Sequence, residues 1–212
     1  MSLPAPDLLR ARILEKFPNA QVEILPNDAP NAQPSLLLGA GAFEVARFLR
    51  DDPELRLDYL SNATGVDYLD VTLKEKVKVK KVVEGVEKEV EETIEKKRAG
   101  FLETVYHLYS MALKHGPVVI RMRTEDREEK THLPSLTPLW RSAEFQEREI
   151  FDLYGIVFDG HPDLRRILMW DEFKDFPMRK DYAEPDDYEY EPTPHDDVLT
   201  KAKAHYPQGA TA

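Results

Sequence analysis

The sequence LETVYHLYSMALKHGPVVIRMR, residues 102–123, decides the fold class. Its two halves are rich in β-branched and aromatic residues and predict strands over 102–113 and 118–123. The link Lys114-His115-Gly116-Pro117 is typical of a hairpin turn. Because two strands joined by so short a link must run antiparallel, the sequence predicts an antiparallel pair here.

The chain before this pair mixes helical and strand patterns. Apolar periodicity predicts helices over 7–17 and 42–50, and strand patterns lie at 21–25, 35–38, Tyr59-Leu60 and 66–69. The patterns do not follow the strict strand–helix alternation of a doubly wound sheet. We therefore expect an α+β fold, with a mixed, largely antiparallel sheet packed against helices.

Residues 74–98 interrupt this organisation with nine basic and seven acidic residues. Val77 and Val79 alternate with lysines, which favours an exposed strand. The Glu- and Lys-rich stretch 87–97 suits a solvated helix or a mobile excursion. A charged insertion at the surface, over about 74–100, is preferred to a specific binding arm.

The C-terminal part loses all periodicity. Residues 171–197 contain eleven acidic and three basic residues, interrupted by prolines. Such a segment predicts an extended acidic tail rather than a second domain. We therefore divide the chain into an α+β domain over 1–168 and an extended, partner-binding tail over 169–212.

Composition limits the function classes. A net charge of −11 argues against nucleic acid and anionic lipid as main partners. The absence of cysteine excludes disulfides, zinc–thiolate sites and cysteine-ligated iron–sulfur clusters in this chain, and it fits a reducing compartment. No apolar run approaches the roughly 18 residues of a spanning helix, and the N-terminus lacks the apolar core of a signal peptide. We therefore expect no direct membrane insertion.

A third helix pattern covers residues 140–154. Thr137 can cap it, Pro138 can take its first position, and Gly155 can end it. Glu147 falls in the middle of the apolar face, where a carboxylate is costly unless it is paired. Glu147 is therefore predicted to join a structural ion pair, or to meet a polar surface.

The other faces of this helix suggest packing on two sides. Arg148 is spaced to pair with both Glu144 and Asp152. Phe145 lies nearly opposite the apolar stripe. A helix with apolar groups on two sides is usually sandwiched between two bodies.

The following loop, residues 155–168, carries His161 and Asp163 two positions apart. A metal site there is disfavoured because Arg165 and Arg166 would repel the ion. Hydrogen bonds that orient the loop, or docking of a partner, fit better. The two arginines suit carboxylates at an interface, or they neutralise this chain's own acids. The chain contains no phosphate-binding loop, no nucleophile elbow and no zinc-protease motif.

These residues resemble a known family. The run Glu147-Arg148-Glu149-Ile150-Phe151-Asp152-Leu153-Tyr154-Gly155-Ile156, continued by Phe158 and by residues 160–168, is similar to the signature of the 30-kilodalton (C) subunit of respiratory complex I. Residues 134–140 and Arg179-Lys180-Asp181-Tyr182 fit the same pattern. The match is good over 101–181 and weaker over 55–73.

The resemblance implies a subunit of the hydrophilic arm of the proton-pumping NADH–quinone oxidoreductase, a translocase of the respiratory electron transport chain. Such a subunit holds no cofactor and has no catalytic site of its own. It packs on the large quinone-site subunit and near iron–sulfur subunits. It lies on the cytoplasmic side of the bacterial inner membrane, as a peripheral protein attached through other subunits.

The resemblance also implies which residues are structural or interfacial. They are Glu147, Arg148, Glu149, Asp152, Gly155, His161, Pro162, Asp163, Arg165, Arg166, Arg179, Lys180, Asp181 and Tyr182.

Residues 74–100 depart from the family pattern, because they are longer and more charged than the connection expected there. The chain ends soon after the tail, so we do not expect a protein that is fused to the quinone-site subunit. One alternative is the equivalent subunit of a membrane-bound hydrogenase or a ferredoxin-dependent quinone reductase. Another is a stand-alone metal-dependent hydrolase that uses Glu147, His161 and Asp163.

Overall fold

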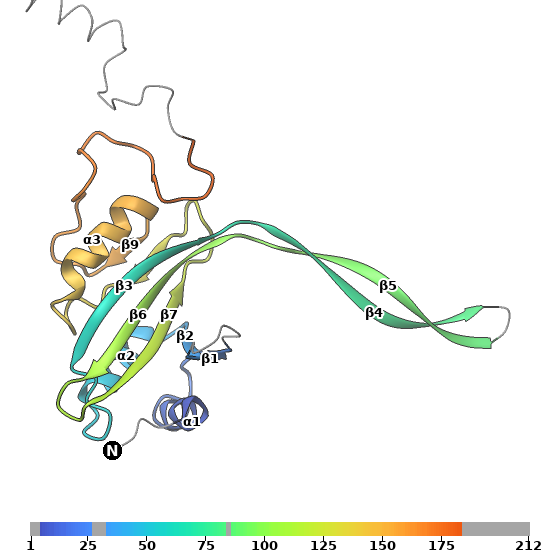
Figure 1. Ribbon diagram of the computed structural model, residues 1–212, viewed down its shortest axis with the longest axis horizontal. Helices are drawn as coiled ribbons and strands as arrows, with labels where there is room; N and C mark the ends of the chain where they lie inside the picture. Colours follow the sequence, from blue (N-terminus) through green and yellow to red (C-terminus); the bar gives the residue numbers. More distant parts are fainter. Residues whose placement is uncertain (1–4, 27–32, 84–85, 184–212) are drawn as a thin grey trace, which may run out of the picture. The chain divides into compact units, whose positions relative to one another are not determined.

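A computed structural model of the protein describes residues 5–26, 33–83 and 86–183. The chain forms one compact unit over Met1–Lys180 and a second over Asp181–Ala212. Figure 1 shows the elements of the first unit. In chain order they are α1 (Pro6–Lys16), β1 (Val22–Leu25), β2 (Ser35–Leu38), α2 (Ala42–Asp51), β3 (Tyr59–Tyr68), β4 (Val71–Val83), β5 (Val86–Arg98), β6 (Phe101–Ser110), β7 (His115–Arg123), β8 (His132–Pro134), α3 (Ala143–Tyr154) and β9 (Val157–Asp159).

The main sheet has five strands in the order β1-β2-β7-β6-β3. Within it β2 and β7 pair in parallel, and the other three neighbouring pairs are antiparallel. β8 and β9 form a short parallel pair of their own. This architecture confirms the predicted α+β class with a mixed, largely antiparallel sheet.

The predicted hairpin is the centre of that sheet. β6 and β7 pair from Glu103 opposite Arg123 to Ser110 opposite His115. The turn lies earlier than the sequence suggested, because β6 ends at Ser110 and β7 already begins at His115. Lys114 and Gly116 both have positive φ, which lets the chain reverse within so few residues.

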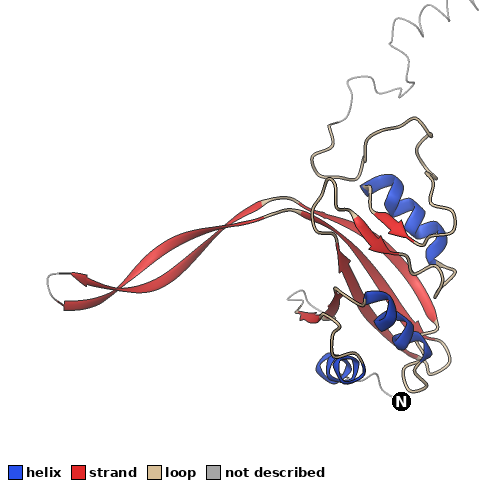
Figure 2. Cartoon of the chain, turned by 180° about the vertical axis from the view of Figure 1, so that it is seen from behind, coloured by secondary structure: helices blue, strands red, loops and turns tan. Residues whose placement is uncertain are grey.

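The helices cover one face of the sheet (Figure 2). Alternate residues of β6 and β7 bury their side chains on that face, because successive side chains of a strand point to opposite sides. α2 packs there through Val45 and Leu49, and α1 through Ile13. The predicted helices over 7–17 and 42–50 are thus confirmed within one residue at each end.

The charged segment forms two long strands instead of a strand and a helix. β4 and β5 pair antiparallel over thirteen residues each and make a sheet of their own. Of the two alternatives for 87–97, the solvated helix is wrong, because these residues belong to β5. Each of them has a directly opposite partner on β4, so the backbone pairs across two strands rather than along a helix.

The helix expected from Thr137 begins six residues later. α3 starts at Ala143, after turns that contain Thr137 and Pro138, and it ends at Gly155 as predicted. Thr137 therefore lies too far before the helix to cap it, and its hydroxyl donates to the carboxylate of Glu147. β3 also differs from expectation, since the two strand-like pieces are one continuous strand over Tyr59–Tyr68.

None of the described helices is both long and apolar enough to cross a membrane. The acidic tail expected over 169–212 falls outside the described residues from residue 184 onward.

Candidate functional site

The signature residues lie on α3 and on the segment that follows it, over residues 155–180. α3 is fastened to β3 and to the loop that enters it. The Trp140 indole donates to the carbonyl of Leu57 at 2.8 Å, and the Ser142 hydroxyl donates to the carbonyl of Leu60 at 2.9 Å. These two residues precede the helix directly, so the first turn of α3 has a fixed position against the sheet.

Glu147 is fully buried in the middle of the apolar face of α3, as its position in the sequence predicted. Its carboxylate accepts four hydrogen bonds. The donors are the Ser135 hydroxyl at 2.6 Å, the Leu136 amide at 2.8 Å, the Thr137 hydroxyl at 3.0 Å and the Tyr106 hydroxyl at 3.1 Å.

None of these donors is a cation, so the expected ion pair of Glu147 is wrong. Neutral hydroxyls and one backbone amide meet the hydrogen-bonding needs of the carboxylate instead. Burial raises the pKa of Glu147, although the four hydrogen bonds act in the opposite direction. Burial, and then the nearby carboxylate, also raise the pKa of Tyr106.

Asp152, one turn further along α3, is also fully buried. It forms an ion pair with Arg166 at 2.7 Å and accepts the backbone amides of Ile167, Leu168 and Met169 at 3.0, 2.6 and 2.9 Å. Burial alone would raise the pKa of Asp152, but these hydrogen bonds outweigh burial and lower it. The Asp152 carboxylate therefore holds four consecutive residues, 166–169, against α3.

Arg148 holds the same segment from the other side. Its guanidinium donates to the carbonyls of Arg165 and Arg166 at 3.2 and 3.3 Å and lies 3.8 Å from the carboxylate of Asp163. The predicted pairing of Arg148 with Asp152 along the helix is therefore wrong. Arg148 bonds to residues 163–166, which are distant in sequence, and Asp152 bonds to Arg166.

His161 ties its loop to the start of α3. Its Nε2 lies 3.0 Å from the carbonyl of Glu144, and its Nδ1 lies 3.1 Å from the amide of Asp163. These partners fit a neutral ring that donates from Nε2 and accepts at Nδ1. Asp163 in turn pairs with Arg165 at 3.0 Å on the exposed side of the loop, next to the exposed Pro162.

Gly155 and Arg179 bring the end of the signature back to the end of α3. Gly155 has a φ of 78°, and a β-carbon there would lie 2.6 Å from the ring of Phe176 and 2.7 Å from Arg179. The Arg179 guanidinium donates to the carbonyl of Tyr154 at 2.7 Å. The glycine is therefore needed for its backbone conformation and for the close approach of residues 176–179.

Asp67 on β3 fixes the last residue of the first compact unit. It accepts the amide of Lys180 at 2.8 Å and a two-point bond from Arg127 at 2.7 and 2.8 Å. Burial, and then the charges of Asp67 and of the exposed Glu149, raise the pKa of Tyr154. Asp181 and Tyr182 are the first residues of the second unit.

The sequence reasoning missed several partners of these residues. Ser135, Tyr106, Asp67 and Arg127 were not predicted as members of the site. A signal existed for Asp67, which is an acid inside the apolar strand pattern Val66-Asp67-Tyr68. No local signal pointed to Tyr106 or Arg127, because each meets its partner through the tertiary fold.

The arrangement brings no metal-binding group together. Within residues 5–26, 33–83 and 86–183, no cluster of three or more histidine, aspartate or glutamate side chains is placed to hold a metal ion. The triad of Glu147, His161 and Asp163 that a hydrolase would use is not formed. Glu147 faces hydroxyls inside the core. The ring of His161 meets instead the carbonyl of Glu144 on α3 and the amide of Asp163 in its own loop.

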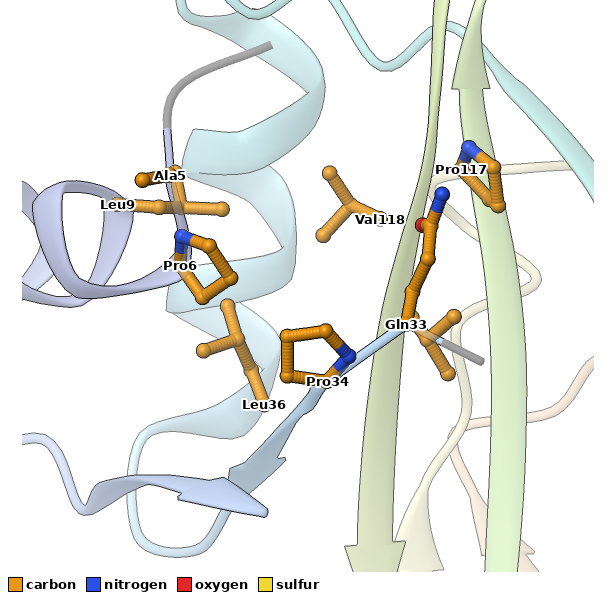
Figure 3. A pocket seen from close by; sticks show the side chains of 9 residues that line it. Ala5, Pro6, Leu9, Gln33, Pro34, Leu36, Pro117 and Val118 are labelled. Atoms are coloured by element: carbon orange, nitrogen blue, oxygen red, sulfur yellow. The ribbon is translucent and has the colours of Figure 1, made fainter. Parts of the chain in front are cut away.

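A cavity of about 260 Å³ lies away from this site, between the start of α1 and the starts of β2 and β7 (Figure 3). Its nine lining residues are apolar or uncharged, and none has a titratable side chain. It therefore offers no acid, base or nucleophile. The surface of α3 that faces away from the sheet is more distinctive.

Three large apolar side chains are exposed on α3 and on the segment bonded to Arg148 and Asp152: Phe145 at 59%, Ile167 at 38% and Leu168 at 58%. Arg148 bonds to both parts of the chain: its guanidinium lies 5.6 Å from the ring centre of Phe145 and donates to the carbonyls of residues 165 and 166, which precede Ile167. We call Phe145, Ile167 and Leu168 the α3 patch.

The family of the chain follows from comparison with known proteins. The family model of the respiratory-chain NADH dehydrogenase 30 Kd subunit matches residues 40–188. A C-type subunit of the NADH-quinone oxidoreductase of Rhizobium meliloti (strain 1021) is 40% identical over 140 residues, which are 66% of this chain and 59% of that protein. The C-type subunit of Roseiflexus castenholzii is 39% identical over 164 residues, which are 71% of this chain and 77% of that protein.

A solved structure described as "Nqo5 of the trypsin-resistant fragment (1-134)" is 26% identical and covers 74% of this chain and 99% of that one, with a TM-score of 0.41. The family rests on the sequence matches, which confirm the resemblance drawn from the signature. The chain belongs to the family of the 30-kilodalton subunit of the respiratory-chain NADH dehydrogenase, which is the C-type subunit family of NADH–quinone oxidoreductases.

Proposed function

We propose that the chain is a non-catalytic structural subunit in the peripheral arm of a proton-pumping NADH–quinone oxidoreductase. In this role it docks onto the quinone-site subunit and supports electron transfer from NADH to quinone. It would sit on the cytoplasmic side of the bacterial inner membrane, attached through the quinone-site and iron–sulfur subunits.

The proposal rests on where the charged residues of the signature lie and what they bond to. Glu147 and Asp152 are fully buried, and Arg148 is almost so, with their polar atoms bonded inside the chain. A catalytic acid or base must reach its substrate within hydrogen-bond distance. The bonds described for these groups are all to residues of this chain. This fits residues that hold a surface in shape rather than residues that act on a substrate.

The α3 patch is the surface so shaped. Asp152 and Arg148 fix the backbone of residues 165–169, which carries the exposed side chains of Ile167 and Leu168, and Arg148 also lies over the ring of Phe145. Exposed apolar groups clustered with an arginine are typical of protein interfaces. Since the other side of α3 packs on the sheet, a partner at the patch would enclose the helix between two bodies, as the sequence suggested.

Arg165 extends the patch with an exposed guanidinium, which suits a carboxylate of the partner. Arg166, by contrast, is bonded to Asp152 inside the chain. Pro162 and Glu149 lie exposed nearby on the loop and the helix. We also propose that the acidic segment after Lys180 binds a partner subunit.

The experiment is co-purification of the tagged chain from its native membranes, with identification of the subunits that accompany it. We expect the quinone-site subunit, the iron–sulfur subunits and the NADH-handling subunits. Recovery with a nickel–iron hydrogenase large subunit would move the chain to the related enzymes. Recovery as a free protein would contradict the proposal.

A further inference from the structure

Cations surround two aromatic rings at the end of the main sheet from which the β4–β5 ribbon extends (Figure 1). The rings of Tyr68, the last residue of β3, and Phe101, the first residue of β6, stack with centres 4.7 Å apart. The guanidiniums of Arg98 and Arg123 lie 5.6 and 4.6 Å from the ring centre of Phe101. The ammonium group of Lys180 lies 5.8 Å from the ring centre of Tyr68. We call these five residues the Phe101 cluster.

The ring pair lies on the face of the sheet that the described helices leave uncovered. On β6 the Tyr106 side chain points toward the helices, because its hydroxyl bonds to α3. Since successive side chains of a strand alternate between the two faces, Phe101, five positions earlier, points the other way. Directly opposite residues share a face, so Tyr68, which pairs with Phe101, lies there too. Arg123 pairs with Glu103, two positions after Phe101, and shares the same face.

The cations of this face outnumber the carboxylates that they meet. Glu103 is fully buried, and it pairs with both Arg121 at 2.6 Å and Arg123 at 2.5 Å. Arg98 and Lys180 form no ion pair with any residue that the structure describes. Four cations therefore share one carboxylate, in a chain whose net charge is −11. Because like charges close together repel, a negative group from elsewhere would stabilise this arrangement.

The two acids nearest to Tyr68 in the sequence do not supply that group. Asp67 pairs with Arg127 at 2.7 Å. Asp70 accepts the amide of the residue before β6 at 2.6 Å, and it lines a separate cavity together with acids of the loop that follows β7. The missing carboxylate therefore comes from outside this part of the chain.

Arg123 keeps hydrogen-bond donors available for such a carboxylate. Its Nε group donates to Glu103 at 2.5 Å, and its side chain remains 32% exposed. Its two Nη groups have no hydrogen-bond partner in the described part of the chain. A guanidinium that one carboxylate and one ring hold in place is pre-organised, and its remaining N–H groups fit a second carboxylate. Arg98, beside the same ring, lies within about 10 Å of Arg123, which is roughly one Debye length, so a carboxylate bound here interacts with both charges.

We propose that the Phe101 cluster binds a carboxylate of an acidic segment in a neighbouring protein subunit of the same enzyme. The Nη groups of Arg123 donate to this carboxylate, and Arg98 and Lys180 add their charges. The inference rests on the proposed function, which places the chain in a multisubunit enzyme. The cluster shares no residue with the α3 patch, so it is a second and separate contact.

The ligand is a protein segment rather than the headgroups of an anionic membrane. A chain with a net charge of −11 is repelled as a whole by such a membrane. Two copies of the chain repel each other for the same reason. Arginine beside aromatic rings is typical of the centre of protein interfaces, which favours a different subunit as the partner.

The main test compares two matched variants of the full tagged chain, recovered from native membranes. Arg98→Gln with Lys180→Gln removes two charges of the cluster. The control is Arg47→Gln with Lys16→Gln, on α2 and α1, where the two cations also lie over aromatic rings, at 5.4 and 4.4 Å from the ring centres. We expect roughly tenfold lower recovery of partner subunits with the cluster variant and unchanged recovery with the control. Urea unfolding checks that both variants fold.

A charge-preserving variant separates recognition of a carboxylate from simple packing. Arg98→Lys with Lys180→Arg exchanges the two side chains and keeps both cations. We expect this variant to retain most of the recovery that the cluster glutamine variant loses. Recovery as low as that of the glutamine variant would overturn the proposal, because side-chain shape rather than charge would then decide assembly.

The contact can also be observed in the unmodified complex. A carbodiimide joins an amine to a carboxylate that touches it, and Lys180 supplies an amine within the cluster. We expect Lys180 to be coupled to an aspartate or glutamate of another subunit, and Lys16 not to be. Absence of this coupling, together with equal recovery of the two glutamine variants, would overturn the proposal.

Failure of this inference can be told apart from failure of the proposed function. Equal recovery of the two glutamine variants, while the wild-type chain recovers its subunits, would contradict the role of the cluster alone. A wild-type chain that recovers no subunit would contradict both. Coupling of Lys180 to a second copy of this chain would overturn the proposed partner. Binding of the isolated chain to phosphatidylglycerol vesicles, abolished by Arg98→Gln with Lys180→Gln, would do the same.

Discussion

Glu147 and Asp152 are fully buried acids on one helix, yet their surroundings shift their pKa values in opposite directions. Glu147 meets only neutral donors, so the cost of burying its charge prevails and raises its pKa. Asp152 meets an arginine and three backbone amides, which lower its pKa. The two acids therefore act on stability in different pH ranges.

Glu147→Gln should make the chain's stability less dependent on pH above the usual glutamate pKa of about 4.3. A raised pKa stabilises the fold fully below the usual glutamate value of about 4.3, and this stabilisation is lost as pH rises through the folded value. Glutamine cannot ionise, so the variant loses an acceptor oxygen at every pH but avoids the loss of stability that ionisation of Glu147 causes. Urea unfolding at several pH values measures both effects.

The free energy of unfolding of Glu147→Gln, relative to wild type, should therefore improve as the pH rises. A difference that stays constant from below the usual glutamate pKa of about 4.3 up to neutral pH would contradict the raised pKa of Glu147.

Asp152→Asn should cost about 3–5 kcal/mol of unfolding free energy at pH 7, because it leaves the Arg166 guanidinium without its buried partner. Since the pKa of Asp152 is lowered, its contribution is present above the usual aspartate value of about 3.9 and is lost as pH falls through the folded value. The control is Asp163→Asn, which removes an exposed pair with Arg165. Similar unfolding midpoints for both variants would show that Asp152 does not organise residues 166–169.

Gly155, which ends α3, and Gly160, which follows β9, are directly comparable. Gly155 and Gly160 both have positive φ, near 80°, so alanine should cost about 1–2 kcal/mol of backbone strain at either position. At Gly155 the new methyl group would also overlap Phe176 and Arg179, whereas at Gly160 nothing lies within 4 Å. Gly155→Ala should therefore destabilise the chain by at least about 1 kcal/mol more than Gly160→Ala.

Chemical denaturation of both alanine variants measures this difference. Equal losses would mean that residues 176–179 do not pack against the end of α3 as described.

Elements with a clear period could be predicted from the sequence, and elements defined by their partners could not. The helix of 42–50 and the hairpin after 102 carry their own periodicity and turn residues, so local physics determines them. The Glu- and Lys-rich composition of 87–97 suits a helix when it is considered alone, and the pairing of its backbone with β4 makes it a strand. The predicted start of α3 was also wrong. Thr137 lies in a turn before the helix, and its hydroxyl donates to a carboxylate ten residues away.

The same distinction applies to the site. The burial of Glu147 followed from its place among apolar residues, whereas its partners did not. Tyr106 reaches it from β6, 41 positions away in the chain. The charge of Arg148 suggested pairs along the helix, but the fold brings the 163–166 loop closer.

The boundary of the first compact unit can be tested by truncation. That unit ends at Lys180, whose amide bonds to Asp67. A chain that ends at Asp181 should therefore keep the unfolding midpoint of the full chain but recover less of its partner subunits. A lower midpoint would show that the removed residues contribute to the core of the first unit.

Docking through the α3 patch is the central claim for the whole molecule. The most direct measurement is the amount of quinone-site subunit recovered per tagged chain from native membranes. Phe145→Ser with Leu168→Ser should lower this ratio about tenfold, whereas Leu8→Ser with Met111→Ser should leave it unchanged. The control residues are exposed to a similar degree, at 66% and 65%, but lie on α1 and at the β6–β7 turn. An unchanged ratio for the patch variant, or an equal fall in both variants, would contradict docking through the patch.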